Sequence, residues 1–488
     1  MRRGLAVGLV LLLAAGGYAG LDIEDRVPGI LTLDPSPARS ADPASPLPVA
    51  TGGGEEPAAV AVPLAEASPA TPLRVAGTQA PLPAGPALSR VLAPALADPG
   101  LGRSLGVTVR DAATGVHLLD RNPERPGIPA STTKLLTATA VMATLDPRLT
   151  LATRAVTGAT SRDVVLVAGG DTLLAPGRGT PTAVAGRAGL DDLARQTAAA
   201  LTARGVRSIR LHLDDRLAPG PRYAPAWEPV DIAAGLTGAV ATMGLSTQRP
   251  RPGAASPHDP AMSAARDFRS ALGRHGIAVV RDVDRAASRA VAAGAPLGEV
   301  RSAPVAEVLA LALADSDNAL TESLARQAAA HAGRSGAALG FAEVADWVRQ
   351  QVRAQGVDVA GVTMLDTSGL SRGTVLPVRV LGDVLALAAR GTLPGLREVV
   401  AGLPVAGLTG TLHDRFRTPR SHPAAGIARA KTGTLTGASA LAGSVVDRDG
   451  RLLLYVVLAD EIPPGVGTLT ARAALDRFVA TLATCGCR

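Results

Sequence analysis

In its second hundred residues the chain reads Pro129-Ala130-Ser131-Thr132-Thr133-Lys134-Leu135-Leu136. Pro129 interrupts the preceding segment and an apolar run with helical spacing follows, which predicts a helix that begins near Ser131. Residues three apart share one helix face, so the amine of Lys134 lies beside the hydroxyl of Ser131. A desolvated lysine has a lowered pKa and can take the proton of a serine, which makes the serine a nucleophile. The alternative is a capping serine followed one turn later by an exposed lysine.

Lysine is rare in this chain. Of its 49 basic residues, 47 are arginine, and the two lysines are Lys134 and Lys431. Arginine stays protonated and is broader than an ammonium, so it cannot replace a lysine that acts as a base or fits a tight site. Lys431 opens the motif Lys431-Thr432-Gly433-Thr434, and one of only two asparagines closes Ser316-Asp317-Asn318. We infer that these uncommon residues mark a single site.

Composition limits the class of protein. The chain has 488 residues, of which 47% are hydrophobic but only 2% aromatic, so it can bury a large core built from Ala, Val and Leu. The formal net charge is +7. The arginines are scattered, however, and aromatic side chains that could stack on bases are nearly absent, so we predict no nucleic-acid binding. Attraction to an anionic cell surface fits this charge better.

The first residues predict export. Residues 1–21 carry Arg2 and Arg3 followed by a nearly continuous apolar stretch, which is typical of a signal peptide or membrane anchor. We favour an uncleaved anchor, because no clear cleavage site follows and the stretch is just long enough to span a bilayer. Residues 22–87 are rich in Pro, Ala, Gly and Ser and predict a disordered linker. The expected location is the cell envelope outside the cytoplasm, either anchored or secreted.

The remaining sequence predicts an α/β fold. Strand patterns at 105–110, 116–119, 438–446 and 452–458 indicate an antiparallel sheet, and helical patterns surround it. Residues 159–302 differ, with short strands among loops rich in Gly, Pro and Arg. We therefore predict an inserted subdomain there, within a discontinuous catalytic domain formed by 88–158 and 303–488.

Neither a metal nor a cofactor is expected. The seven histidines show no metal-binding spacing, and no Gly-rich phosphate loop links a strand to a helix. Cys485 and Cys487 are too few for a zinc site, and with one residue between them a mutual disulfide is expected to be strained. We assign these cysteines no catalytic role.

The three motifs, in the order Ser131-Thr132-Thr133-Lys134, Ser316-Asp317-Asn318 and Lys431-Thr432-Gly433, resemble those of penicillin-binding proteins and serine β-lactamases. Ser316 follows Ser131 by 185 positions, and a segment of this length between the two motifs resembles the D-alanyl-D-alanine carboxypeptidase/endopeptidase branch, the low-molecular-mass class C penicillin-binding proteins. This resemblance implies a transpeptidase-like fold, with an antiparallel sheet flanked by helices and a subdomain inserted between the first and second motifs.

The resemblance also implies roles for the catalytic residues. Ser131 would attack the D-Ala-D-Ala carbonyl, with Lys134 as its base. Ser316, close to Lys431, would pass a proton to the departing amine, and Asn318 would hold the substrate amide. The backbone N–H groups of Ser131 and Thr434 would form the oxyanion hole. Asp317 is expected to be a solvated loop residue.

Further residues are implied to bind substrate. They are Thr432, Gly433 and Thr434 for the terminal carboxylate, helped by the charge of Lys431; Ser368 and Arg372 for the side-chain end of the stem peptide; and Asp231, near Trp227, for an amino group there. For Trp227 and Asp231 a surface role is an equal alternative, because both fall in the inserted region.

The function we predict is a serine-type D-Ala-D-Ala carboxypeptidase, endopeptidase or both, acting on peptidoglycan stem peptides and inhibited by β-lactam antibiotics. One alternative is a β-lactamase or esterase on the same scaffold. The class A deacylation motif Glu-x-x-x-Asn is missing, since no asparagine follows Asn318. The other alternative is a non-catalytic wall-binding module, in which we would expect Lys134 or Lys431 to have become arginine.

Overall fold

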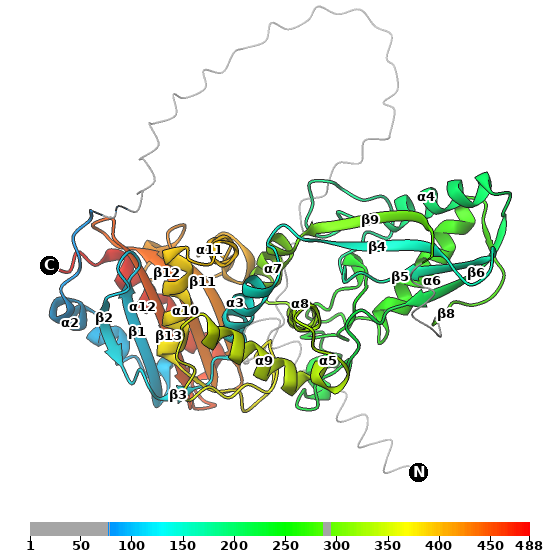
Figure 1. Ribbon diagram of the computed structural model, residues 1–488. Helices are drawn as coiled ribbons and strands as arrows, with labels where there is room; N and C mark the ends of the chain where they lie inside the picture. Colours follow the sequence, from blue (N-terminus) through cyan, green and yellow to red (C-terminus); the bar gives the residue numbers. More distant parts are fainter. Residues whose placement is uncertain (1–76, 78, 286–293) are drawn as a thin grey trace, which may run out of the picture. The chain divides into compact units, whose positions relative to one another are not determined.

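The computed structural model describes residue 77, residues 79–285 and residues 294–488 (Figure 1). The leader expected at 1–21 and nearly all of the linker expected at 22–87 lie outside these residues. Within the described ranges, no helix has the length and apolar character needed to cross a membrane.

A five-stranded antiparallel sheet contains the four strands that the sequence predicts for it. Its strand order is β11-β12-β13-β1-β2. The bounds are β1 Ser104–Asp111, β2 His117–Arg121, β11 Arg429–Leu435, β12 Ala438–Val446 and β13 Leu452–Asp460. The antiparallel sheet predicted from the patterns at 105–110, 116–119, 438–446 and 452–458 is confirmed, and in it β1 pairs with β2 and β12 pairs with β13. The chain's last strands therefore lie beside its first ones.

Both faces of this sheet are buried, which explains why β13 is almost wholly apolar. Leu454, Val456 and Leu458 point into one hydrophobic core, whereas Leu453 and Val457 point into the other. Successive side chains of a strand face opposite ways, so a single apolar strand serves both cores. Helices α3 and α10 contribute to the first core and α2 and α12 to the second, and Figure 1 shows α10 and α12 on opposite sides of the sheet.

The helices take these bounds: α2 Gly85–Leu96, α3 Lys134–Thr144, α4 Leu190–Ala203, α5 Pro229–Ala233, α6 Pro260–Arg274, α7 Val305–Ala314, α8 Asn318–His331, α9 Phe341–Ala354, α10 Val378–Arg390, α11 Pro394–Ala401 and α12 Gly467–Thr484. A two-stranded ribbon adds β3 Pro126–Gly127 and β10 Leu376–Pro377. Helices α3, α7, α8, α9, α10 and α11 all contribute to the first core. Of these, α3 begins at Lys134 and α8 begins at Asn318, residues of the first two motifs.

A second sheet, of mixed direction, has its own core. It contains β4 Thr150–Thr157, β5 Asp163–Val167, β6 Ser208–Asp214, β7 Ala278–Val279, β8 Asp284–Arg285 and β9 Pro296–Pro304. Helices α4 and α6 pack on it around Leu, Ala and Phe side chains. Because β4 pairs with both β5 and β9, we propose that the inserted subdomain begins at β4 and ends at β9, slightly wider than the expected 159–302.

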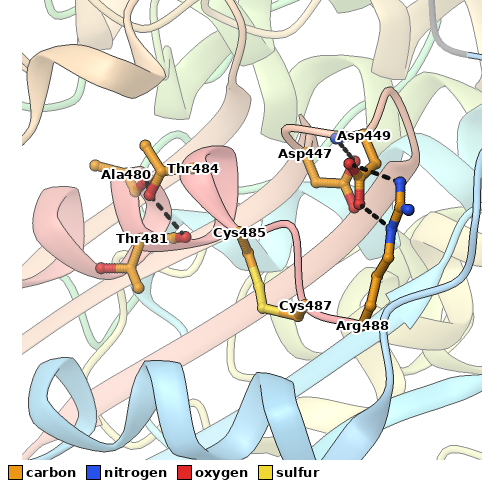
Figure 2. Close-up of a disulfide and its surroundings, with 8 residues drawn as sticks. All are labelled: Asp447, Asp449, Ala480, Thr481, Thr484, Cys485, Cys487 and Arg488. Carbon is orange, nitrogen blue, oxygen red and sulfur yellow. Dashed lines mark hydrogen bonds and ion pairs between the residues drawn. A yellow bond between two sulfur atoms is a disulfide. The ribbon is translucent and has the colours of Figure 1, made fainter.

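The two cysteines, for which we expected a mutual disulfide to be strained, form a disulfide with each other at the end of α12 (Figure 2). Cys485 leaves the helix with an extended backbone, and the two Cα atoms lie 5.2 Å apart, within the normal range for a disulfide. Arg488 then reaches back to the carboxylate of Asp449 in the β12–β13 turn. The chain end is thereby fixed to the sheet, far along the sequence from any predicted site residue.

Candidate active site

The first motif forms a short turn before the helix. A 3-10 turn covers Ala130–Thr133, and α3 proper begins at Lys134. Ala130 has a positive φ of 46°, an uncommon value for a residue with a Cβ. Such strain tends to concentrate at functional sites, where the surrounding structure enforces it. The turn leaves Ser131 half-exposed and directs Lys134 into the protein, where its side chain is fully buried.

The buried amine of Lys134 has three hydrogen-bond acceptors. Its Nζ lies 2.9 Å from Ser131 Oγ, 2.5 Å from Asn318 Oδ1 and 2.8 Å from the Ser368 carbonyl oxygen. The alternative of an exposed lysine behind a capping serine is therefore wrong. Burial lowers the pKa of Lys134 to about 8, although the carboxylates of Asp366, Glu322 and Asp317 act to raise it. An amine that loses its proton this easily can serve as a base.

The second motif lies between α7 and α8 and meets the other lysine. Ser316 has a positive φ of 57°, and its Oγ accepts a hydrogen bond from Lys431 Nζ at 3.0 Å. Asn318, the first residue of α8, accepts from Lys134 and donates to the Leu236 carbonyl at 2.7 Å. The three motifs are thus joined by direct hydrogen bonds, as we expected from the rarity of these residues.

Asp317 is not the solvated loop residue that we expected. It is buried and caps α8 by accepting from the Leu320 N–H, and it pairs with Arg249 at 2.9 Å. A carboxylate at a helix N-terminus also interacts favourably with the helix dipole. Asp317 therefore fixes the start of the helix that carries Asn318, and Arg249 connects it to the segment before α6.

The third motif lies on β11, at the edge of the first sheet. Lys431 is fully buried, and burial, followed by the nearby charge of Lys134, lowers its pKa well below the usual value. Thr432 Oγ1 donates to Thr411 Oγ1 at 2.9 Å, which ties the strand to the loop after α11. Thr432 and Thr434 are half-buried on the same strand face, with Gly433 pointing the other way.

Gly433 lets the strand approach the nucleophile turn. A Cβ at this position would overlap the Pro129 carbonyl oxygen and press on the Ala130 and Ala440 side chains. We expect Gly433→Ala to lower the free energy of unfolding by about 1–3 kcal/mol and to slow acylation, because the turn that holds Ser131 must shift. Thermal unfolding and labelling by fluorescent penicillin measure both effects. Gly273→Ala in α6, where the added Cβ meets open space, is the control, and equal behaviour of the two variants would contradict this view.

The loop 366–372 closes the site from another direction. Asp366 accepts from the backbone N–H groups of Gly369 at 2.6 Å and Ser371 at 2.7 Å, and from Trp227 Nε1 at 2.8 Å. Ser368 is fully buried and offers its main-chain carbonyl to Lys134. Trp227 is buried as well, so the surface role considered for it is wrong. Sequence patterns alone did not indicate that this tryptophan anchors the loop.

Arg372 and Asp231 approach each other at the end of this loop. Arg372 is 54% exposed, and its Nε lies 3.8 Å from Glu228 Oε1. Burial raises the pKa of Asp231, and the charge of Arg372 acts against that rise. The structure thus brings these two predicted residues near one another, with Asp231 on the short helix α5.

Glu322 is a residue that the sequence analysis missed. It lies four positions after Asn318 and therefore on the same face of α8, which is the signal that could have found it. Its carboxylate is buried and accepts three hydrogen bonds from Thr367 and Ser368. No group of three or more His, Cys, Asp and Glu side chains that could hold a metal ion occurs in the described parts of the chain.

Comparisons with known proteins identify the family of this chain. The profile of the D-Ala-D-Ala carboxypeptidase 3 (S13) family matches residues 88–249 and 236–482. Carboxypeptidase DacB of Mycolicibacterium smegmatis is 37% identical over 84% of this chain and 86% of its own length. The D-alanyl-D-alanine carboxypeptidase of Actinomadura sp. is 30% identical over 74% of this chain and 79% of its own length.

The fold is also that of a solved relative. The crystal structure of penicillin binding protein 4 from Haemophilus influenzae superposes with a TM-score of 0.64 and 20% identity, covering 82% of this chain and 98% of that one. At this identity the likeness shows the fold, including the additional subdomain. The expected α/β transpeptidase-like architecture is confirmed. Taken with the profile match, these findings show that the chain belongs to the D-Ala-D-Ala carboxypeptidase 3 (S13) family.

Proposed function

We propose that this D-Ala-D-Ala carboxypeptidase works through an acyl-enzyme on Ser131, with Lys134 as the base. One observation carries the assignment: the amine of Lys134 is wholly buried, yet it lies 2.9 Å from the hydroxyl of Ser131. Its other two acceptors, an amide oxygen and a main-chain carbonyl, are neutral. Such surroundings orient the amine without an ion pair that would hold its proton.

In the acylation step, Ser131 Oγ attacks the carbonyl carbon of the penultimate D-Ala while Lys134 Nζ takes the hydroxyl proton. The backbone N–H groups of Ser131 and Thr434 would stabilise the negative charge that develops on the carbonyl oxygen. The peptide C–N bond then breaks, and the terminal D-Ala leaves as an amine. Ser316 supplies the proton for this amine and takes one from Lys431, 3.0 Å away. The proton that Lys134 took from Ser131 then replaces the one that Lys431 gave, so both lysines are restored before water enters.

Substrate orientation falls to the remaining site residues. Asn318 would hold the substrate amide, and Thr432 and Thr434 would bind the terminal carboxylate at the open side of β11. Arg372 and Asp231, one cationic and one anionic, would receive the side-chain end of the stem peptide. Water finally hydrolyses the Ser131 ester, which restores the hydroxyl and releases the shortened peptide.

The pKa of Lys134 predicts the pH profile. Because Lys134 must be neutral to accept the serine proton and has a pKa of about 8, we expect kcat/KM to rise with pH and to level off above about pH 8. Below that value activity should fall about tenfold per pH unit, since the protonated fraction then dominates. Steady-state assays of a D-Ala-D-Ala peptide between pH 5.5 and 10 measure this rise of kcat/KM with pH, the acid limb of the profile. A profile that stays flat down to pH 6 would exclude a base with this pKa.

The substrate is tested with defined peptidoglycan fragments. We expect the full chain to release one D-Ala from a pentapeptide stem, and mass spectrometry detects the shortened product. A cross-linked dimer in the same assay reports whether the enzyme also cuts between stems, as an endopeptidase does. The Ser131→Ala variant is the control. Cleavage of neither fragment by the parent protein, or equal cleavage by both proteins, would refute the proposal.

Two further expectations concern partners and location. A β-lactam has a strained amide and a carboxylate that mimic the substrate, so we propose that penicillin acylates Ser131 and inhibits the enzyme.

The enzyme acts on peptidoglycan and thus outside the cytoplasm. We further propose that residues 1–21 keep it attached to the membrane, which fractionation of cells producing the full chain would detect.

A further inference from the structure

Three buried polar residues form one stripe along α8. Asn318, Glu322 and Arg326 are spaced four residues apart, so they share a helix face, and all three are nearly inaccessible to solvent. Burying an ionisable side chain costs free energy unless it is well satisfied. Asn318 already contacts the proposed base. The two ionisable residues behind it have no part in the mechanism above.

Glu322 binds the main chain that supplies an acceptor to Lys134. Its Oε1 accepts from the backbone N–H of Thr367 at 2.9 Å and from that of Ser368 at 2.7 Å. Its Oε2 accepts from Thr367 Oγ1 at 2.6 Å. The carbonyl of Ser368 in turn accepts from Lys134 Nζ at 2.8 Å. Ser368 therefore links the two side chains: its N–H binds the Glu322 carboxylate, and its carbonyl orients the Lys134 amine.

The same segment is attached to the nucleophile helix. Thr137, one turn after Lys134 on α3, donates from Oγ1 to the Thr367 carbonyl at 2.6 Å. Asp366 fixes the following turn by accepting from Gly369 and Ser371. Glu322 thus connects this loop to α8, the helix that also carries Asn318. The Asn318 side chain and the Ser368 carbonyl, which both accept hydrogen bonds from Lys134, are therefore held in place by one helix.

Glu322 is also one of several charges around Lys134. The others are Asp317, which caps α8 and pairs with Arg249, Asp366 in the loop, and Lys431 on β11. Burial, and then the charge of Asp366, raise the pKa of Glu322 to about 7. It therefore changes charge in the same pH range in which Lys134 does.

Arg326 lies behind Glu322 on the same stripe. Its guanidinium is stacked 4.9 Å from the centre of the Phe341 ring, and its Nε has no hydrogen-bond partner among the described residues. Burial lowers the pKa of Arg326 to about 10, and the charge of Glu322 opposes that change. A buried cation on this side favours the ionised form of Glu322, the form that can accept all three hydrogen bonds.

We propose that Glu322 is a positioning residue of this hydrolase: its carboxylate holds the Thr367–Ser368 peptide so that the Ser368 carbonyl meets Lys134, and its negative charge stabilises the ammonium form of that lysine. The inference rests on the proposed function, in which Lys134 is the base. Glu322 then has two separable tasks: the length and hydrogen bonds of its side chain hold the loop, and its negative charge favours the protonated form of Lys134.

Two conservative variants separate these tasks. Glu322→Gln keeps the length of the side chain and an oxygen for the backbone N–H groups but removes the charge. We expect the acid limb of acylation by fluorescent penicillin to move about one pH unit lower, with a maximal rate within about threefold of the parent. Glu322→Asp keeps the charge but is one methylene too short. We expect its acid limb to stay in place while the maximal rate falls about 100-fold.

The controls distinguish this inference from the function on which it rests. Glu398→Gln removes an exposed carboxylate on α11 and should match the parent in rate and pH profile. Circular dichroism and thermal unfolding of each variant check the fold. If Ser131→Ala is still acylated, the proposed function itself fails. If Ser131→Ala is inactive while Glu322→Gln and Glu322→Asp both keep the parent rate and pH profile, Glu322 does not position Lys134 and only this inference is overturned.

Discussion

Replacing Lys134 with arginine is expected to reduce acylation by several orders of magnitude while the protein stays folded. Arginine is accommodated at 47 other positions, so a loss here reports chemistry rather than a general intolerance of this residue. The guanidinium keeps its proton at any accessible pH and cannot accept one from Ser131. It is also broader than an ammonium, and the Lys134 side chain is fully buried between Asn318 and Ser368.

The second-order rate constant for labelling by fluorescent penicillin measures this effect. Lys134→Arg and the parent are compared at pH 9, where the lysine of the parent is largely neutral. Thermal unfolding shows whether the variant remains folded. Activity within about tenfold of the parent corresponds to a barrier change of only about 1.4 kcal/mol and would mean that Lys134 is structural rather than catalytic.

Lys431 is expected to recognise the terminal carboxylate of the substrate. Burial lowers its pKa well below the usual value, and the carboxylate would bring an anion that favours the charged form. We predict activity in the order parent, Lys431→Arg, Lys431→Ala. Arginine keeps the charge but fits less well beside Ser316, whereas alanine also removes a charge-assisted contact of roughly 1.5–3 kcal/mol.

Paired substrates isolate this contact. For each variant, kcat/KM is measured with a D-Ala-D-Ala peptide and with its C-terminal amide, which lacks the negative charge. Lys431→Ala should lose most of the preference for the free carboxylate, and Lys431→Arg should retain part of it. If Lys431→Ala discriminates between the two peptides as well as the parent does, the carboxylate is recognised elsewhere.

The three motifs could be predicted because each is short and contains a residue that the composition makes rare. In a chain that uses arginine for nearly every cation, Lys134 and Lys431 stand out, and the structure joins them to Asn318 and Ser316 by direct hydrogen bonds. The antiparallel strands could be predicted equally well, because the apolar pattern and the turn that indicate each strand lie within a few neighbouring residues. The extra sheet was recognised as an insertion, but nothing local to β4 reveals with which strands it pairs.

What could not be predicted depends on contacts between residues far apart in the sequence. Asp317 was expected to be a solvated loop residue, because the sequence does not show that Arg249 and the N-terminus of α8 lie beside it. Trp227 packs against Phe341 and donates a hydrogen bond to Asp366, which are 114 and 139 positions later in the sequence. Ser368 contributes its main-chain carbonyl, and main-chain groups carry no residue-specific signal. The role of Glu322 could not be predicted either, because the Thr367 backbone N–H that it binds is 45 positions away in the sequence.

Identification of the residue that penicillin acylates tests the central claim most directly. The full chain is incubated with penicillin, digested, and analysed by tandem mass spectrometry, with Ser131→Ala treated in parallel. The account predicts that the penicilloyl group is on Ser131 and that the variant carries none. A penicilloyl group on any other residue of the parent, or labelling that persists in Ser131→Ala, would contradict it.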